Sequence, residues 1–258
     1  MLDGGASLAL IAMAGFVGGL VRGYSGFGFA MAAVPMLAVV VPPALAVPAV
    51  LLHELAIGLF SLRAERASLD WPKLRALAAG SIIGTPVGLL VLVSVPAGPM
   101  RIAIALLVIV SLGVIWRRRA RPLGLGRATL GVAGFASGLL NGAAAMSGPP
   151  AIVVLLGSAL SPANVRGLLV YFILFSAAIG VALSLASGIQ GEHTLRIAAT
   201  MAPGVLAGTL LGVRLFKVLP QAHYRAIAIG VLLVIAVGSL GSSIGAGALA
   251  HPTPRITP

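Results

Sequence analysis

Long uncharged apolar stretches, separated by short basic segments, dominate the sequence. Residues 102–116, 167–190 and 226–250 are examples, with lengths near or above the roughly 20 residues that a helix needs to cross a bilayer. The stretches lack the period-two alternation of a transmembrane barrel, and lipid offers the backbone no hydrogen-bonding partners. The pattern therefore predicts an all-α, polytopic integral membrane protein.

The same pattern occurs twice along the chain. Gly15-Phe16-x-x-Gly19-Leu20-x-x-x-Gly23 returns 119 residues later as Gly134-Phe135-x-x-Gly138-Leu139-x-x-x-Gly142, and Pro43-Ala44 returns as Pro162-Ala163. Further correspondences follow in the same order, among them Gly84-Thr85-x-x-Gly88 with Gly208-Thr209-x-x-Gly212. We expect membrane repeat 1 at 1–116, a basic cytoplasmic linker at 117–127, membrane repeat 2 at 128–250 and a C-terminal tail at 251–258.

Each repeat opens with a glycine-rich segment that has an unusual length. In repeat 1 this segment covers about residues 8–41, roughly 50 Å as one helix, which exceeds a 30 Å hydrocarbon core. It is too short for two comfortable crossings. The length predicts a re-entrant, broken helical hairpin with 23–26 and 141–148 near the two tips, followed in each repeat by three transmembrane helices.

The basic residues give a test of this topology, because short cytoplasmic loops are enriched in Lys and Arg. Most of the 17 basic residues lie in 63–75, 117–127 and 214–225. These segments share one side only if each opening segment returns to the side from which it entered. Each repeat then crosses an odd number of times, which predicts two inverted repeats with both termini outside. If each opening segment crossed the membrane only once, the basic segment 214–225 would lie outside and the charge asymmetry would weaken.

Composition excludes several classes of protein. The chain is 59% hydrophobic and 9% charged, whereas soluble domains carry about 25% charged residues. The net charge of +12 is spread over short loops, which argues against nucleic-acid binding. The absence of cysteine excludes disulfides and cysteine metal sites, and His53-Glu54 lacks the second histidine of a zinc protease helix. We expect no enzyme activity, no cofactor and no metal.

Three ionisable residues within the apolar segments are candidates for chemistry. Arg22 precedes the first tip and His53-Glu54 lies within the following span, where a charge costs at least about 2.5 to 3.5 kcal/mol. One hypothesis gives Arg22 the charge of the substrate, with His53 and Glu54 carrying a coupled proton. The alternative is that Arg22 and Glu54 pair only to neutralise each other.

The tips themselves form a second candidate site. The returning half of a hairpin presents its helix N-terminus, whose N–H groups and partial positive charge suit an anion. Tyr171 is added because it follows Pro162-Ala163 at about the distance at which His53 follows Pro43-Ala44. Tight helix packing is the alternative explanation of the glycines. The predicted substrate-binding residues are Arg22, Gly23, Tyr24, Ser25, Gly26, Asn141, Gly142, Ser147, Gly148 and Tyr171.

The segment from Gly15 to Pro35 resembles the opening motif of the sulfite exporter TauE/SafE family, and Gly134 to Pro150 resembles the second copy of that motif. The resemblance covers nearly the whole chain. It implies an inner-membrane permease for sulfite, sulfoacetate or other organosulfonates, coupled to protons. Repeat 2 has Ala145 and Ser147 where repeat 1 has Gly26 and Gly28, so the two tips need not contribute equally.

The leading hypothesis is a secondary transporter of a small anion that works by alternating access. A passive anion channel is the first rival, and a membrane-embedded enzyme or partner subunit is the second. The expected partners are a small anionic substrate and the lipid bilayer, and the sequence leaves a homo-oligomer open.

Overall fold

The computed structural model describes residues 4–62, 69–117, 124–218, 230, 232–239 and 241, and the regular structure in these ranges is helical. Its elements are α1 (Gly5–Ser25), α2 (Phe29–Val40), α3 (Pro43–Ser61), α4 (Trp71–Ser94), α5 (Ala97–Arg117), α6 (Arg127–Ala144), α7 (Gly148–Leu156), α8 (Pro162–Ala186) and α9 (Glu192–Val218). Six of them, α1, α3, α4, α5, α8 and α9, are long and apolar enough to cross a membrane. The predicted polytopic all-α class is confirmed. The predicted tail and most of the predicted linker lie outside the described residues.

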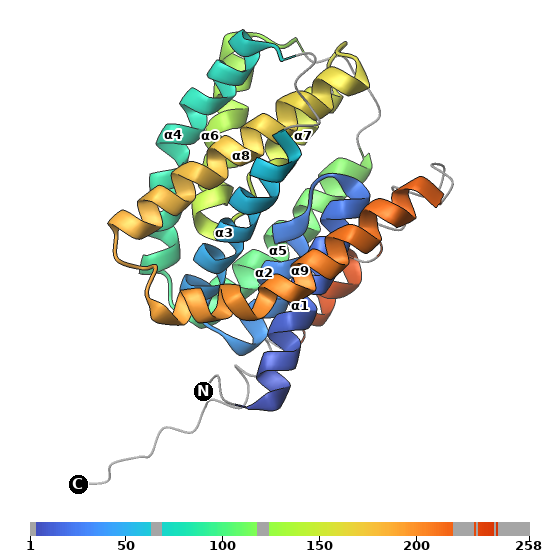
Figure 1. Cartoon of the computed structure of the whole chain (residues 1–258). Coiled ribbons are helices and arrows are strands. Elements are labelled where there is room, and N and C mark those ends of the chain that lie inside the picture. The colour runs from blue at the N-terminus through green and yellow to red at the C-terminus, as the bar shows by residue number, and fades with distance from the viewer. Residues whose placement is uncertain are drawn as a thin grey trace, which may run out of the picture.

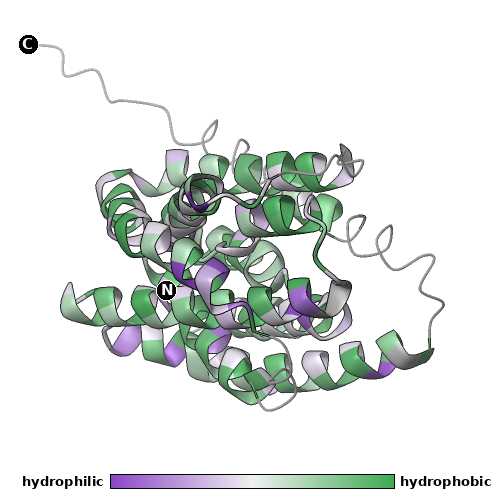
Figure 2. Ribbon diagram, turned by 90° about the horizontal axis from the view of Figure 1, so that it is seen from above, coloured by the Kyte–Doolittle hydropathy of each residue, from purple (hydrophilic) through white to green (hydrophobic). Residues whose placement is uncertain are grey.

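The residues of the helices are mostly hydrophobic, as Figure 2 shows, and many of them lie on the outer faces. Large apolar side chains are well exposed, including Ile83 at 64%, Val132 at 70% and Leu210 at 63%. A water-soluble bundle would place polar residues at such positions. An apolar outer surface on several helices fits a protein whose surroundings are lipid.

Each glycine-rich opening segment forms a helix, a break and a second helix that folds back. In the first hairpin, Gly18 of α1 packs against Phe29 and Ala33 of α2, a contact that one continuous helix would not allow. In the second hairpin, the backbone N–H of Ala151 in α7 donates to Ser137 Oγ in α6 at 3.2 Å. The broken-hairpin form was therefore predictable, while the depth of the tips in a bilayer stays a prediction.

The two arms of each hairpin are unequal. Helix α1 has 21 residues and α2 has 12, while α6 has 18 and α7 has 9. At 1.5 Å per residue α1 is about 31 Å long, close to the thickness of the hydrocarbon core. The first arm is thus longer than a shallow re-entrant arm, and the helix continues through Ser25 before it breaks.

The opening helix of each repeat packs along a long helix of the other repeat. Helix α1 runs beside α9, and α6 runs beside α4 (Figure 1). A Cβ atom added at Gly23 would collide with the carbonyl of Thr209, and one at Gly142 with the carbonyl of Thr85. Because glycine lets two backbones approach closely, these contacts form a glycine ladder in each pair. Its other rungs on the opening helices are Gly15, Gly19, Gly134 and Gly138.

Helices α3 and α8 occupy corresponding places in the two repeats and lie antiparallel. Gly58 of α3 is beside Leu174, and Gly180 of α8 is beside Leu51, so the numbers rise along one helix while they fall along the other. Two repeats that run in opposite directions through the membrane would make corresponding helices antiparallel. The inverted-repeat arrangement stays a prediction, and this contact supports it.

Candidate functional site

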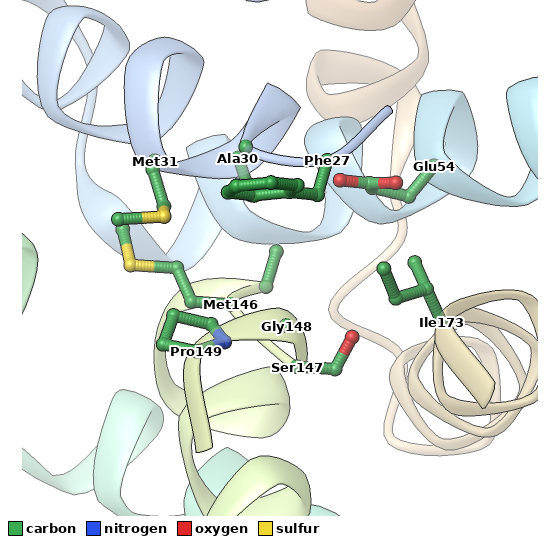
Figure 3. A pocket seen from close by; sticks show the side chains of 11 residues that line it. Phe27, Ala30, Met31, Glu54, Met146, Ser147, Gly148, Pro149 and Ile173 are labelled. Carbon is green, nitrogen blue, oxygen red and sulfur yellow. The ribbon is translucent and has the colours of Figure 1, made fainter. Parts of the chain in front are cut away.

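The two hairpin breaks meet at a small cavity inside the bundle (Figure 3). Its volume of about 20 Å³ is room for about one water molecule. Helix α3 contributes Glu54 to the wall and α8 contributes Ile173. The other lining residues come from the breaks and the first turns after them: Phe27, Gly28, Ala30, Met31, Ala145, Met146, Ser147, Gly148 and Pro149.

Matching backbone turns end the first arm of each hairpin. Gly26 has a φ of 77° and its N–H donates to the Arg22 carbonyl at 2.7 Å. Ala145 has a φ of 57° and its N–H donates to the Asn141 carbonyl, also at 2.7 Å. A left-handed residue at this position ends a helix and satisfies one of its last carbonyls. Glycine adopts this conformation without strain, whereas alanine does not.

A buried ion pair lies beside the cavity. Arg22 Nη1 on α1 is 3.7 Å from Glu54 Oε2 on α3, and the two side chains are 3% and 6% exposed. Neither of these two atoms has a hydrogen-bond partner within the described part of the chain. The pairing predicted as one alternative therefore exists, but the pair is long and leaves hydrogen-bonding capacity on both groups.

The two tips differ in the backbone donors that they offer. In the first hairpin, Ala30 in the first turn of α2 keeps its backbone N–H and lies beside the Glu54 carboxylate at the cavity. In the second, Pro149 and Pro150 occupy the first turn of α7, and proline has no N–H. The amide of Ala151 donates to Ser137. The expected convergence of backbone amides on one anion is therefore reduced at the second tip.

The predicted substrate-binding residues divide between the cavity and the helix contacts. Ser147 and Gly148 line the cavity together with Glu54. Gly23 and Gly142 are rungs of the two glycine ladders, where they touch the backbones of α9 and α4. For these two glycines, tight helix packing accounts for the residue type.

Two other predicted residues stand away from the cavity. Asn141 is 1% exposed and its Nδ2 donates to the carbonyl of Ser176 on α8 at 2.8 Å. Tyr171 packs against the hydrophobic cluster around Leu168 and Phe172. The position on α8 that reaches the cavity is Ile173, two residues further on, which is roughly 200° around the helix.

The His53 side chain is directed toward α9 instead of the cavity. Its Nε2 lies 3.0 Å from the carbonyl oxygen of Ala198, and its ring meets Phe29 edge-on with centroids 6.0 Å apart. Successive residues of a helix point about 100° apart, so His53 and Glu54 face different neighbours. The structure thus places Glu54, and not His53, at the cavity wall.

A second, larger cleft lies on the other side of the first break, with a volume of about 480 Å³. Tyr24, Ser25 and Gly26 line it together with Arg166 of α8. Tyr24 is 7% exposed and meets Phe216 of α9 edge-on, with ring centroids 6.4 Å apart. Gly23 lines it as well, so the cleft collects four of the predicted residues that do not reach the cavity.

Sequence reasoning missed Phe27, Met31, Met146 and Ile173, which line the cavity. Figure 3 shows Met31 and Met146 pointing toward each other across it. A signal was present, since the 119-residue offset of the first motif aligns Glu54 with Ile173 and Phe27 with Met146. Applied to every position, that offset would have found both pairs.

Two broken hairpins that meet at a buried charged site define a polytopic membrane protein of the secondary-transporter type. The chain belongs to the sulfite exporter TauE/SafE family, whose model matches residues 11–239. It is also similar to the "Probable sulfite/organosulfonate exporter TauE" of Cupriavidus necator, with 29% identity over 212 residues that cover 81% of this chain and 83% of the relative. No solved structure matches the chain. The family resemblance drawn from the motifs is confirmed.

Proposed function

We propose that this protein exports a small sulfur-containing anion, sulfite or an organosulfonate, across the cell inner membrane by alternating access. Family membership and the name of the Cupriavidus necator relative support the substrate class. The observation that carries the mechanism is the long ion pair between Arg22 and Glu54 at the meeting point of the two breaks.

The pair suggests how an anion and a proton are coupled. A buried guanidinium requires a counter-anion, because an unpaired buried charge costs several kcal/mol. Glu54 supplies that counter-anion when it is ionised. Protonation of Glu54 leaves Arg22 without a partner, and the substrate anion then takes the place of the carboxylate. One anion and one proton therefore bind together, with Arg22 holding the anion and Glu54 holding the proton.

This coupling is compatible with export. A sulfite dianion that moves with one proton carries one net negative charge. Outward movement of that charge releases about 2.3 kcal/mol per 100 mV of an inside-negative potential. The proton therefore does not cancel the driving force from the membrane potential.

The size of the cavity supports a carrier over an open channel. Its 20 Å³ holds about one water molecule, whereas sulfite has four heavy atoms. The breaks must separate before the anion enters. We infer that the structure represents a closed state between two open ones, and that alternating access moves the breaks relative to α3 and α8.

Flux of labelled sulfite and sulfoacetate into proteoliposomes, measured with and without a pH gradient, tests the proposal. We expect the purified protein to carry at least one of these anions and the rate to respond to the gradient. Glu54→Gln should transport without responding to the gradient, while Asp70→Asn, a carboxyl change at the start of α4, should behave as the wild type. Absence of flux for both anions, or an unchanged response to the gradient in Glu54→Gln, would overturn it.

A further inference from the structure

Phe27 stands between the small cavity and the larger cleft. It lines the small cavity that contains Glu54 and also the larger cleft that contains Arg166. Within the described part of the chain, it is the residue common to both linings. Its side chain is half-buried, while the neighbouring Gly26 is exposed and faces the cleft. The ring therefore forms a thin partition between an accessible space and a closed one.

The backbone around Phe27 is built to move. Gly26 and Gly28 flank it with φ values of 77° and 88°, so the residue is held between two left-handed positions. A Cβ atom at Gly26 would meet no atom within 4 Å, so packing does not hold this position. Glycine at both positions allows the backbone dihedral angles to change at low cost.

A side-chain latch holds the present position of the ring. The hydroxyl of Ser25 donates to the carbonyl of Phe27, and the N–H of Phe27 donates back to Ser25 Oγ at 3.3 Å. The same hydroxyl contacts the carbonyl of Val21 at 2.7 Å. These bonds connect the break to the last turn of α1. They are weak enough to exchange, because water can replace each of these hydrogen bonds when the break opens.

The cleft has the size and chemistry of an access site for an organic anion. Its 480 Å³ lies within the roughly 300–1,000 Å³ of small-ligand sites. Arg166 supplies positive charge to its wall, and Leu169, Val170 and Phe216 supply apolar surface. An anion with a short apolar part matches this wall better than a bare inorganic ion does.

We propose that Phe27 is the gate between the access cleft and the Glu54 cavity, hinged at Gly26 and Gly28 and latched by Ser25. The corresponding residue of the second break, Met146, is 2% exposed and lines the cavity without lining the cleft. Access from the cleft therefore passes the first break and not the second. Such a gate controls access to the cavity, whichever anion is transported.

Thiol labelling tests the gate directly, because the chain contains no cysteine. Ser147→Cys places one thiol at the cavity wall, and the rate of its modification by a small anionic methanethiosulfonate reports access. With this reporter in the purified protein, we expect Phe27→Ala to raise the rate several-fold and Phe27→Leu to raise it less. Phe27→Trp should lower it.

Met146→Ala is the matched control, because it also enlarges the cavity but does not open the cleft. We expect it to leave the labelling rate near that of the reporter alone. Equal rates in the Phe27 series, or an equal increase in Met146→Ala, would overturn the gate. Should Phe27→Ala not fold, the comparison of Phe27→Leu with Phe27→Trp decides in the same way. A loss of sulfite flux with these labelling rates intact would instead count against the proposed function.

Discussion

The two broken hairpins share a backbone plan but differ in chemistry. Both end their first arm at a left-handed residue whose N–H donates to the carbonyl four positions earlier, at 2.7 Å. Both use a glycine ladder against a helix of the other repeat. The first hairpin, however, holds Arg22 and faces Glu54, while the second has Asn141 and faces Ile173 at the corresponding positions.

This difference separates the structural role of the duplication from its chemical role. The ladders and turns recur because both copies must pack in the same way. The charged pair occurs in the first copy, where the substrate and the proton are proposed to bind, and the second copy closes the cavity with Met146, Ser147 and Ile173. Variants that make the two hairpins more alike, or less alike, test this division.

The largest effect is expected when the first hairpin receives the chemistry of the second. Arg22→Asn or Glu54→Ile alone leaves one buried charge without its partner, which should lower the free energy of unfolding by about 3–5 kcal/mol. The double variant Arg22→Asn/Glu54→Ile buries neither charge and should recover most of that loss. It should also lose anion binding, measured by titration calorimetry in detergent.

Denaturant unfolding of the four proteins forms a double-mutant cycle for this prediction. Strong coupling between the two positions is the expected result. Additive losses of stability would show that the two residues act independently. Anion binding by the double variant would show that Arg22 is not part of the binding site.

A smaller effect, equal in the two repeats, is expected for the glycine ladders. Gly23→Ala and Gly142→Ala each force a methyl group against the backbone of the neighbouring helix, which should cost about 1–3 kcal/mol of stability. Gly113→Ala in α5 is the control, since a Cβ there meets no atom within 4 Å. The melting temperature should fall for both ladder variants and stay unchanged for the control. A lower melting temperature for only one of the two variants would contradict an equal packing role of the two ladders.

Opposite effects of about 1 kcal/mol are expected at the two turns. Gly26→Ala introduces a side chain at a left-handed residue and should destabilise the protein by about that amount. Ala145→Gly removes the same strain and should stabilise it by less than about 1 kcal/mol, because glycine also gains freedom in the unfolded chain. Changes of the same sign in the two melting temperatures would show that the turns are not equivalent.

Effects of about 1 kcal/mol or less, which depend on pH, are expected at the starts of α4 and α9. Asp70 accepts from the backbone N–H of Lys73 at 3.2 Å, and its hydrogen bond with the Lys73 side chain lowers the pKa of the carboxyl. Asp70→Ala should cost about 1 kcal/mol. The contribution of Asp70 is present above its unfolded pKa and is lost as the pH falls through its lowered folded pKa.

The corresponding control is Glu192→Ala in the first turn of α9. Its ion pair with Arg196, at 2.6 Å, is exposed, and such pairs contribute about 0.2–1 kcal/mol. Melting curves between neutral and acid pH should show an acid-dependent loss in the wild type that is smaller in Asp70→Ala. Identical pH dependence in the wild type and Asp70→Ala would contradict the stabilisation of the α4 N-terminus by Asp70.

Much of the fold was predictable because the glycine pattern and the length of the apolar segments constrain it. A segment from 8 to 41 is too long for one crossing and too short for two, so a broken hairpin was the remaining choice. The motif predicted a tip near 23–26, and α1 ends within that range, with Gly26 as its C-cap. The unequal arms did not, because helix propensity does not say that α1 continues through Ser25 before it ends.

The site was predictable only in part. Arg22 and Glu54 stood out because charges are costly in an apolar segment, but their pairing depends on how the fold brings residues of α1 and α3 together. Substrate binding at Gly23 and Gly142 stays a prediction, since a glycine that admits a ligand and one that admits a helix look the same in a sequence, and both residues touch a neighbouring helix. Ile173 carries no polar signal, so only its contact with the cavity identifies it.

Proton uptake on anion binding tests the central claim most directly. Purified protein in weakly buffered detergent solution is titrated with sulfoacetate near neutral pH while the pH is recorded. The account predicts uptake of about one proton per bound anion in the wild type and none in Glu54→Gln, which should still bind the anion. Binding by the wild type without proton uptake would contradict the exchange of Glu54 for the substrate at Arg22.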